Sequence, residues 1–211
     1  MRFSSILLAI GLCITSCQNH QKKCDPPTID ESILQEGDLA FRQGYSAASR
    51  MVLAADRTGS YSHAGIIVHD STGWKVIHAV PGETDKEYPE ERIKKETLSQ
   101  FYAPDRSMSG AIYRLDTSFT IREIAAKKAN ELFQRKLFFD HDYDSNDSTK
   151  MYCTELLYFT YGVAGIDISE NRRTTFPGFR NPFILPQDII SNKLLNRIFF
   201  YSLDLQKDST K

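Results

Sequence analysis

One cysteine and two histidines are the residues of this sequence best suited to nucleophilic chemistry. Cys153 opens an apolar stretch with helical spacing. The unpaired backbone amides of a first helical turn stabilise a thiolate, so we expect a lowered pKa and a nucleophile that can attack a carbonyl carbon. The alternative is a buried, inert Cys153, because free cysteine is among the most buried residue types.

The histidines lie in two stretches rich in branched residues, joined by the turn sequence at 70–73. An antiparallel hairpin about this turn places Gly65 opposite His78, so His63 and His78 share a face as diagonal neighbours. A register slip of one residue would separate them. We expect His63 to act as general base for Cys153, and His78 to orient the His63 ring and stabilise its protonated form.

Other polar residues near these stretches are expected to play no part in the chemistry. His69 lies at the turn end of the hairpin beside Trp74, and His141 lies in an acidic stretch. Both are expected to face solvent. Glu155 follows Cys153 by two positions, about 200° round a helix, and is expected to be structural.

A zinc site is the competing use of the same three side chains. His63, His78 and Cys153 are of types that ligate zinc in catalytic centres. The sequence has no closely spaced ligand pair such as H-x-x-x-H. We therefore expect no metal and no cofactor.

The elements that must position these residues alternate between strands and helices. The hairpin is predicted at 62–69 and 74–80, and a helix at 151–162 should carry Cys153 in its first turn. Residues 163–186 have a loop-like composition. Further strands are expected at 37–41, 110–115 and 198–203. Further helices are expected at 47–55, where Ser46 is the cap, and at 187–195. Another helix should begin at the capping box Thr120–Glu123 and have one apolar face, formed by Ile124, Ala125, Ala129, Leu132 and Phe133.

Composition excludes several classes of protein. The chain has 211 residues, 41% of them hydrophobic, which is enough for a packed core. A net charge of -1 gives no basic surplus for nucleic acid, so none is expected as a partner. The four cysteines do not have the density of a disulfide scaffold.

The N-terminus has the pattern of an exported protein. An apolar run at 6–14 is too short to cross a bilayer but suits a signal peptide. The run Ile14-Thr15-Ser16-Cys17 resembles a bacterial lipobox, which predicts a signal peptide at 1–16 and acylation of Cys17; the alternative is an ordinary signal peptide cleaved nearby. We expect a lipidated N-terminus and polar linker at 17–35, the folded domain at 36–205 and a polar tail at 206–211.

Four segments together resemble a known family. The sequence is similar to the circularly permuted papain-like NlpC-type cysteine peptidases, the YiiX/YebB-like group, from about Gly37 to Asp188. In this group the histidine hairpin precedes the cysteine helix, as it does here. The segments are Glu36-Gly37-Asp38-Leu39-Ala40-Phe41, Tyr61-Ser62-His63-Ala64-Gly65-Ile66, Val76-Ile77-His78-Ala79 and Tyr152-Cys153-Thr154-Glu155-Leu156-Leu157.

The resemblance implies an α+β fold, with an antiparallel sheet or small barrel packed against helices. It also implies that Cys153 is the nucleophile, His63 the base and His78 the third member of a triad. The function expected is a cysteine hydrolase of the cell envelope that cleaves an amide bond, with cell-wall peptide as the first substrate class.

Two alternatives remain open. The related lecithin:retinol acyltransferase-like proteins use two histidines and one cysteine, which makes a lipid acyl group a competing substrate. Phe176, Phe179 and Phe183 could line a groove for it, or could be core aromatics. A lipoprotein that only binds lipid or glycan is the non-enzymatic alternative. In each case the membrane is an expected partner through the N-terminal acyl chains, and the location is the bacterial envelope, facing the periplasm.

Overall fold

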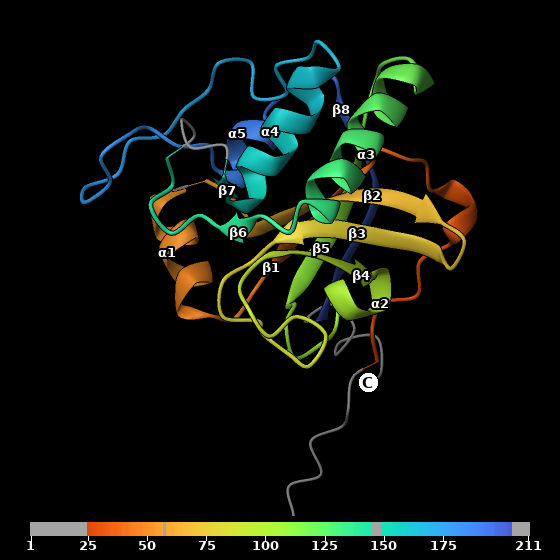
Figure 1. Cartoon of the computed structure of the whole chain (residues 1–211), viewed down its shortest axis with the longest axis horizontal. Helices are drawn as coiled ribbons and strands as arrows, with labels where there is room; N and C mark the ends of the chain where they lie inside the picture. The colour runs from red at the N-terminus through yellow and green to blue at the C-terminus, as the bar shows by residue number, and fades with distance from the viewer. Residues whose placement is uncertain (1–24, 57, 145–148, 204–211) are drawn as a thin grey trace, which may run out of the picture.

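A six-stranded antiparallel sheet forms the centre of the molecule (Figure 1). The structure is a computed structural model that describes residues 25–56, 58–144 and 149–203. The strand order is β4-β3-β2-β1-β5-β8. The strands are β1 (Leu39–Gln43), β2 (His63–Asp70), β3 (Gly73–Ala79), β4 (Ile93–Thr97), β5 (Ser109–Leu115) and β8 (Leu195–Ser202).

Short elements and five α-helices complete the described fold. The largest helices, α3 and α4, lie side by side on one face of the sheet, and α2 lies on the other (Figure 1). The helices are α1 (Ala47–Ala55), α2 (Leu98–Phe101), α3 (Phe119–Gln134), α4 (Cys153–Val163) and α5 (Pro186–Ile190), with a 3-10 turn η1 (Glu31–Ile33) and a parallel pair formed by β6 (Phe138–Phe139) and β7 (Lys150–Met151).

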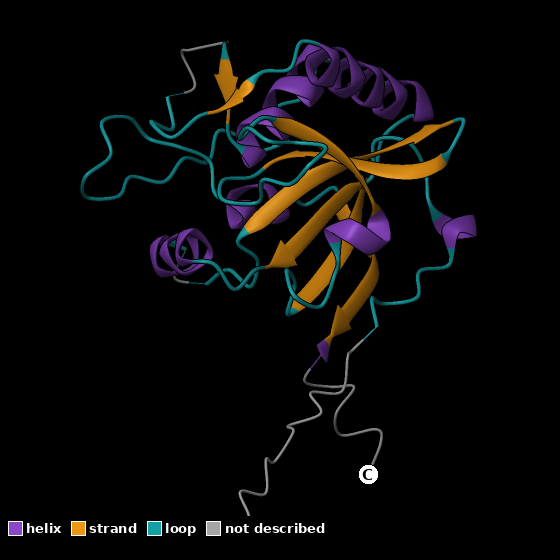
Figure 2. Cartoon of the chain, turned by 60° about the horizontal axis from the view of Figure 1, so that its bottom comes forward, coloured by secondary structure: helices purple, strands orange, loops and turns teal. Residues whose placement is uncertain are grey.

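Alternation along the strands divides the apolar core between the two faces. One face buries Phe41, Ile66 and Ile77 beneath α3 and α4. The other buries Ile67 and Val76 beneath α2 and its neighbours. Figure 2 shows the strong twist of this sheet between its helical layers. The fold is therefore α+β, as predicted.

The hairpin has the predicted register. In the β2–β3 pair, Gly65 faces His78 and Ile67 faces Val76. The turn begins at Asp70, whose carboxylate accepts hydrogen bonds from the amide and hydroxyl of Thr72 at 2.9 and 2.7 Å. Because side chains alternate across a strand, this register puts both histidines on the α2 face.

Two helix predictions were correct and two need correction: the helix expected at 187–195 is the short α5, which ends at Ile190, and the chain enters β8 at Leu195. Ser46 caps α1, and Cys153 is the first residue of α4. The capping box expected at Thr120 is not the start of α3, because Ser118 caps that helix two residues earlier. Of the predicted buried face, Ala125, Ala129 and Leu132 are buried, whereas Ile124 is 40% exposed, because it lies about 100° round the helix from Ala125.

The N-terminal predictions fall outside the described residues. The signal peptide at 1–16 and Cys17 lie in the segment 1–24, and the tail at 206–211 lies in the segment 204–211. Within the described part of the chain, none of the helices has both the length and the apolar character needed to cross a bilayer.

Candidate active site

His63 and His78 contact each other through their rings. His63 Nε2 lies 2.9 Å from His78 Nδ1, although the two residues are on different strands and not directly paired. Both are buried, at 5% and 0% exposure. The contact commits Nε2 of His63, so Nδ1 is the nitrogen of that ring left for a reacting group.

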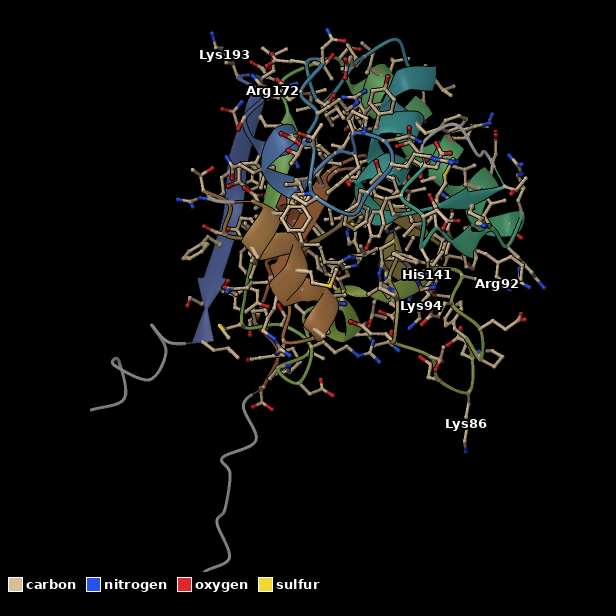
Figure 3. The ribbon with its side chains drawn as sticks, turned by 90° about the vertical axis from the view of Figure 1, so that its left-hand side faces the viewer. Lys86, Arg92, Lys94, His141, Arg172 and Lys193 are labelled. Carbon is tan, nitrogen blue, oxygen red and sulfur yellow. The ribbon has the colours of Figure 1, made fainter. Side chains whose placement is uncertain are left out.

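Glu96 extends this contact to a third side chain. His78 Nε2 lies 3.1 Å from Glu96 Oε2 on β4. Glu96 Oε1 in turn lies 2.7 Å from Lys94 Nζ and 3.0 Å from Arg106 Nη1. Figure 3 shows Lys94 close to the body of the protein, whereas Lys86, in the loop between β3 and β4, extends away from it. Sequence reasoning missed β4 and with it Glu96.

The ring of Phe101 and the buried side chain of Arg42 pack near the two histidines on the α2 face of the sheet. The Phe101 ring lies 5.6 Å from that of His63 and 5.1 Å from that of His78. The Arg42 guanidinium lies 4.8 Å from the centre of the same ring and donates to the Phe101 carbonyl at 2.7 Å. Arg42 also pairs with Glu83. The histidines therefore have little freedom to rotate.

Cys153 approaches the histidine strand from the opposite layer. It is partly exposed and free, at the N-terminus of α4. The backbone amides of Ala64, the residue after His63, and of Thr154 lie near the sulfur and favour its charged form. The structure thus brings the predicted nucleophile to the start of β2, where His63 lies.

The charge state of the thiol differs from the sequence prediction. Burial raises the pKa of Cys153 above its ordinary value, although hydrogen bonds from Ala64 and Thr154 act in the opposite direction. The expected lowering of this pKa was wrong, because the desolvation of the sulfur outweighs the favourable end of the helix. Cys153 therefore rests as a neutral thiol.

The two histidines rest neutral as well. Burial lowers the pKa of His63 well below its ordinary value, and the charges of Arg42 and Lys94 lower it further. Burial also lowers the pKa of His78, against the opposing effect of Glu96. A neutral imidazole beside a neutral thiol suits general-base activation of the thiol and not a preformed ion pair.

Cys153 and His63 line one cavity. Its other polar side chains are those of Arg42, Ser46, Ser49, Ser62, Glu83 and Thr154. The rest of the wall is mainly apolar and comes from α1, the end of β3, and the segments before α4 and α5: Val52, Ala79, Val80, Pro81, Phe139, Tyr143, Tyr152, Phe183, Ile184, Leu185 and Pro186.

The three phenylalanines expected at a groove do not share one position. Phe183 is buried and lines the cavity. Phe179 packs on it with ring centres 4.9 Å apart, and Phe176 lies 6.2 Å from Phe179. Neither of these two lines the cavity. Phe183 is thus both a core aromatic and part of the cavity wall, whereas Phe176 and Phe179 pack against the core.

Tyr143 lines the cavity on an unusual backbone. Its φ is 52°, in the left-handed region that a tyrosine rarely adopts. The buried carboxylate of Asp140 holds this turn by accepting the amides of Asp142 at 2.9 Å and Asp144 at 2.7 Å. The Tyr143 hydroxyl lies within electrostatic range of Cys153, and burial raises its pKa. Sequence reasoning missed Tyr143 because its signal is a backbone angle.

The residues predicted to be uninvolved lie away from the thiol. His69 is exposed and packs its ring against Trp74. His141 is exposed and pairs with Glu91 at 2.6 Å. Glu155 is buried, and its carboxylate accepts the Tyr152 amide at 3.2 Å, so it caps α4.

The described residues do not fit a metal site. They contain no group of three or more histidine, cysteine, aspartate or glutamate side chains arranged to hold a metal ion. His63 Nε2 and His78 Nδ1 face each other at hydrogen-bond distance, which is not the geometry of two nitrogens that share an ion.

Comparison with known proteins identifies the family. Residues 33–199 match the family described as "permuted papain-like amidase enzyme, YaeF/YiiX, C92 family". The chain belongs to this family and is therefore an enzyme of the cysteine peptidase and amidase type. No curated protein matches the sequence significantly.

A solved structure supports the fold. The chain resembles the crystal structure titled "metalloprotein yiiX" from Escherichia coli O157:H7, with a TM-score of 0.64 and 17% sequence identity. The match covers 80% of this chain and 98% of that one. The permuted papain-like fold expected from the order of the histidine hairpin and cysteine helix is confirmed.

Proposed function

We propose that this enzyme cleaves an amide bond in cell-wall peptide, with Cys153 as nucleophile, His63 as base and His78 as the residue that orients His63. One observation carries the proposal. His63 has one ring nitrogen bonded to His78 and lines the same cavity as the lone thiol of the described chain. The position of the sulfur near the backbone amide of Ala64, the residue after His63, supports it.

The proposed reaction has two stages. As the sulfur of Cys153 attacks the carbonyl carbon, Nδ1 of His63 takes the thiol proton and then gives it to the leaving amine, which leaves a thioester. Water then attacks the thioester, and His63 takes its proton and returns it to the sulfur as the acid is released. The backbone amide of Cys153, at the start of α4, is the donor we propose for the developing oxyanion.

A lipid acyl group is the second substrate that an observation favours. The cavity wall near the thiol is largely apolar, with Val52, Phe139 and Phe183 among its side chains. Such a wall accommodates a hydrocarbon next to the scissile carbonyl. An acyl hydrolase or acyltransferase would use the same three residues with an alcohol as leaving group.

Substrate analysis separates the proposals. Cell-wall fragments and phospholipids are incubated with the wild type and Cys153→Ala, and the products are compared by mass spectrometry. New peptide fragments with the wild type alone support the amidase, and released fatty acid supports the lipid enzyme. Identical profiles for both proteins, with both substrates, would reject the hydrolase and leave the binding lipoprotein.

We also propose that the enzyme is exported and anchored to a bacterial membrane through acylated Cys17. The part of the predicted linker that precedes Ile29 would then hold the domain off the bilayer, so that only envelope substrates are in reach. The rest of that linker belongs to the folded domain, because Ile29, Ile33 and Leu34 pack against its core. Labelling of cells with a radioactive fatty acid tests this. Label on the wild type that is lost in Cys17→Ala, together with release from the membrane fraction, is expected; equal fractionation of both would contradict it.

A further inference from the structure

The two carboxylate oxygens of Glu96 contact different partners. Its Oε1 lies 2.7 Å from Lys94 Nζ and 3.0 Å from Arg106 Nη1, and its Oε2 lies 3.1 Å from His78 Nε2. The residue is 4% exposed. Burial alone would raise its pKa, but the hydrogen bonds from His78 and Lys94, together with the charge of Lys94, hold that pKa well below its usual range.

An ionised carboxylate is an acceptor only, and this determines the tautomer of His78. Glu96 carries no proton, so the 3.1 Å contact requires the hydrogen to be on His78 Nε2. His78 rests neutral because burial lowers its pKa. A neutral imidazole has a single N–H, so His78 Nδ1 presents a lone pair to His63.

The same reasoning passes to His63. The 2.9 Å contact between His63 Nε2 and the lone pair of His78 Nδ1 requires His63 to be the donor. Since His63 is also neutral, its Nδ1 is unprotonated. We propose that Glu96 is a positioning residue that, through His78, sets the proton of His63 on Nε2 and so leaves Nδ1 free to act as base. This inference rests on the proposed role of His63.

Four other charged side chains surround this chain of contacts. Arg42 on β1 lies beside His63 and pairs with Glu83 from the β3–β4 loop. Lys94 on β4 donates to the Glu83 carbonyl at 2.7 Å, and Arg106 lies 3.6 Å from a Glu83 oxygen. No hydrogen bond joins any of these four side chains to a ring nitrogen of either histidine, whereas Glu96 contacts His78 Nε2 directly, so Glu96 is the charged group that can set the tautomers.

Glu96→Gln is the decisive variant, because glutamine has the same shape but can donate. Lys94 and Arg106 both donate to one side of the group, so the glutamine oxygen is expected there and its NH2 toward His78. His78 must then accept at Nε2 and carry its proton on Nδ1, which forces His63 to carry its proton on Nδ1. We expect kcat to fall about 100-fold or more with KM little changed, since an inverted tautomer removes the base.

A nuclear magnetic resonance measurement tests the inference without relying on activity. Two-bond 1H–15N correlation spectra of labelled protein distinguish protonated from unprotonated ring nitrogens. We expect the N–H on Nε2 of both histidines in the wild type, and on Nδ1 of both in Glu96→Gln. A wild-type spectrum with the His63 proton on Nδ1 would overturn the proposal, even if the variant failed to fold.

A matched control lies on the same strand. Lys95→Gln removes the 3.1 Å ion pair with Asp70 on the other face of β4 and should leave both tautomers and kcat unchanged. An equal loss of kcat in both variants would show that Glu96 matters only for stability and overturn its positioning role. The expected spectra with no His63-dependent reactivity of Cys153 would instead count against the proposed function.

Discussion

Gly65 lies directly opposite His78 in the β2–β3 pair, and no side chain fits between them. A Cβ at Gly65 would lie 2.5 Å from Cγ1 of Val76 and 3.0 Å from Cβ of His78. Gly65 stands between His63 and Ile67 on the same face of β2. The missing side chain therefore leaves the space across which the rings of His63 and His78 meet.

Gly65→Ala should disrupt the site and destabilise the fold. Overpacking at this position is expected to cost about 1–3 kcal/mol of unfolding free energy, because the backbone or His78 must shift. The turnover rate should also fall, because a shift of His78 disturbs its contact with His63. Gly162→Ala is the control, since a Cβ there meets nothing within 4 Å, and a helical alanine should stabilise by up to about 1 kcal/mol. Denaturant unfolding and turnover of both variants provide the measurement; an unchanged rate in Gly65→Ala would contradict the packing argument.

The pH profile should extend unusually far into acid. Protonation of His63 removes the base, and burial together with Arg42 lowers the pKa of His63 below its ordinary 6.5. Activity should therefore persist as pH falls through 6.5 and be lost only below it. A profile of kcat/KM against pH checks this. An acid limb above 6.5 would show that His63 does not rest neutral.

Alkylation of Cys153 should depend on His63. Because burial raises the pKa of the thiol, iodoacetamide should react slowly in the absence of the base, and His63→Ala should lower the rate by about 10²-fold or more. His69→Ala is the matched control, because His69 is exposed and packs on Trp74. Mass spectrometry of the modified protein gives the rates. Equal rates in all three proteins would remove His63 from the mechanism.

Tyr143→Phe should lower the rate while the fold survives. Burial and the nearby sulfur raise the pKa of Tyr143, so its hydroxyl stays protonated and can donate to an oxygen that gains charge beside Cys153. Loss of one such donor costs about 10²- to 10³-fold in kcat elsewhere, and we expect a loss toward the lower end. Asp142→Asn, on the same turn but with an exposed side chain, is the control. A wild-type kcat in Tyr143→Phe would show that the ring serves packing alone.

The hairpin was predictable because its signals agree. Branched residues on both sides of a turn sequence determined the register, and the register placed His63 and His78 on one face. The strand β4 was not predictable in this way. Lys94 and Glu96 are 2% and 4% exposed, yet charged residues at alternate positions indicate a solvated face unless their partners are known. Those partners come from distant segments, as Arg106 does.

The charge state of Cys153 shows a second limit of the sequence. Its place in the first turn of α4 was predicted correctly. Whether that turn lowers the pKa of the thiol depends on what covers the sulfur, and the cover comes from β2 and from the loop that carries Tyr143. The local sequence predicts where the helix begins. The pKa of the thiol also depends on how far separate segments bury the sulfur, because burial opposes the effect of the helix dipole.

The order of the segments has a consequence for how the enzyme is made. Synthesis from the N-terminus produces β2, β3 and β4 before α4, so the strands that carry His63, His78 and Glu96 are made well before Cys153 is added. On the proposed mechanism, an amide bond can be cleaved only after the late cysteine helix has docked against the early histidine strand.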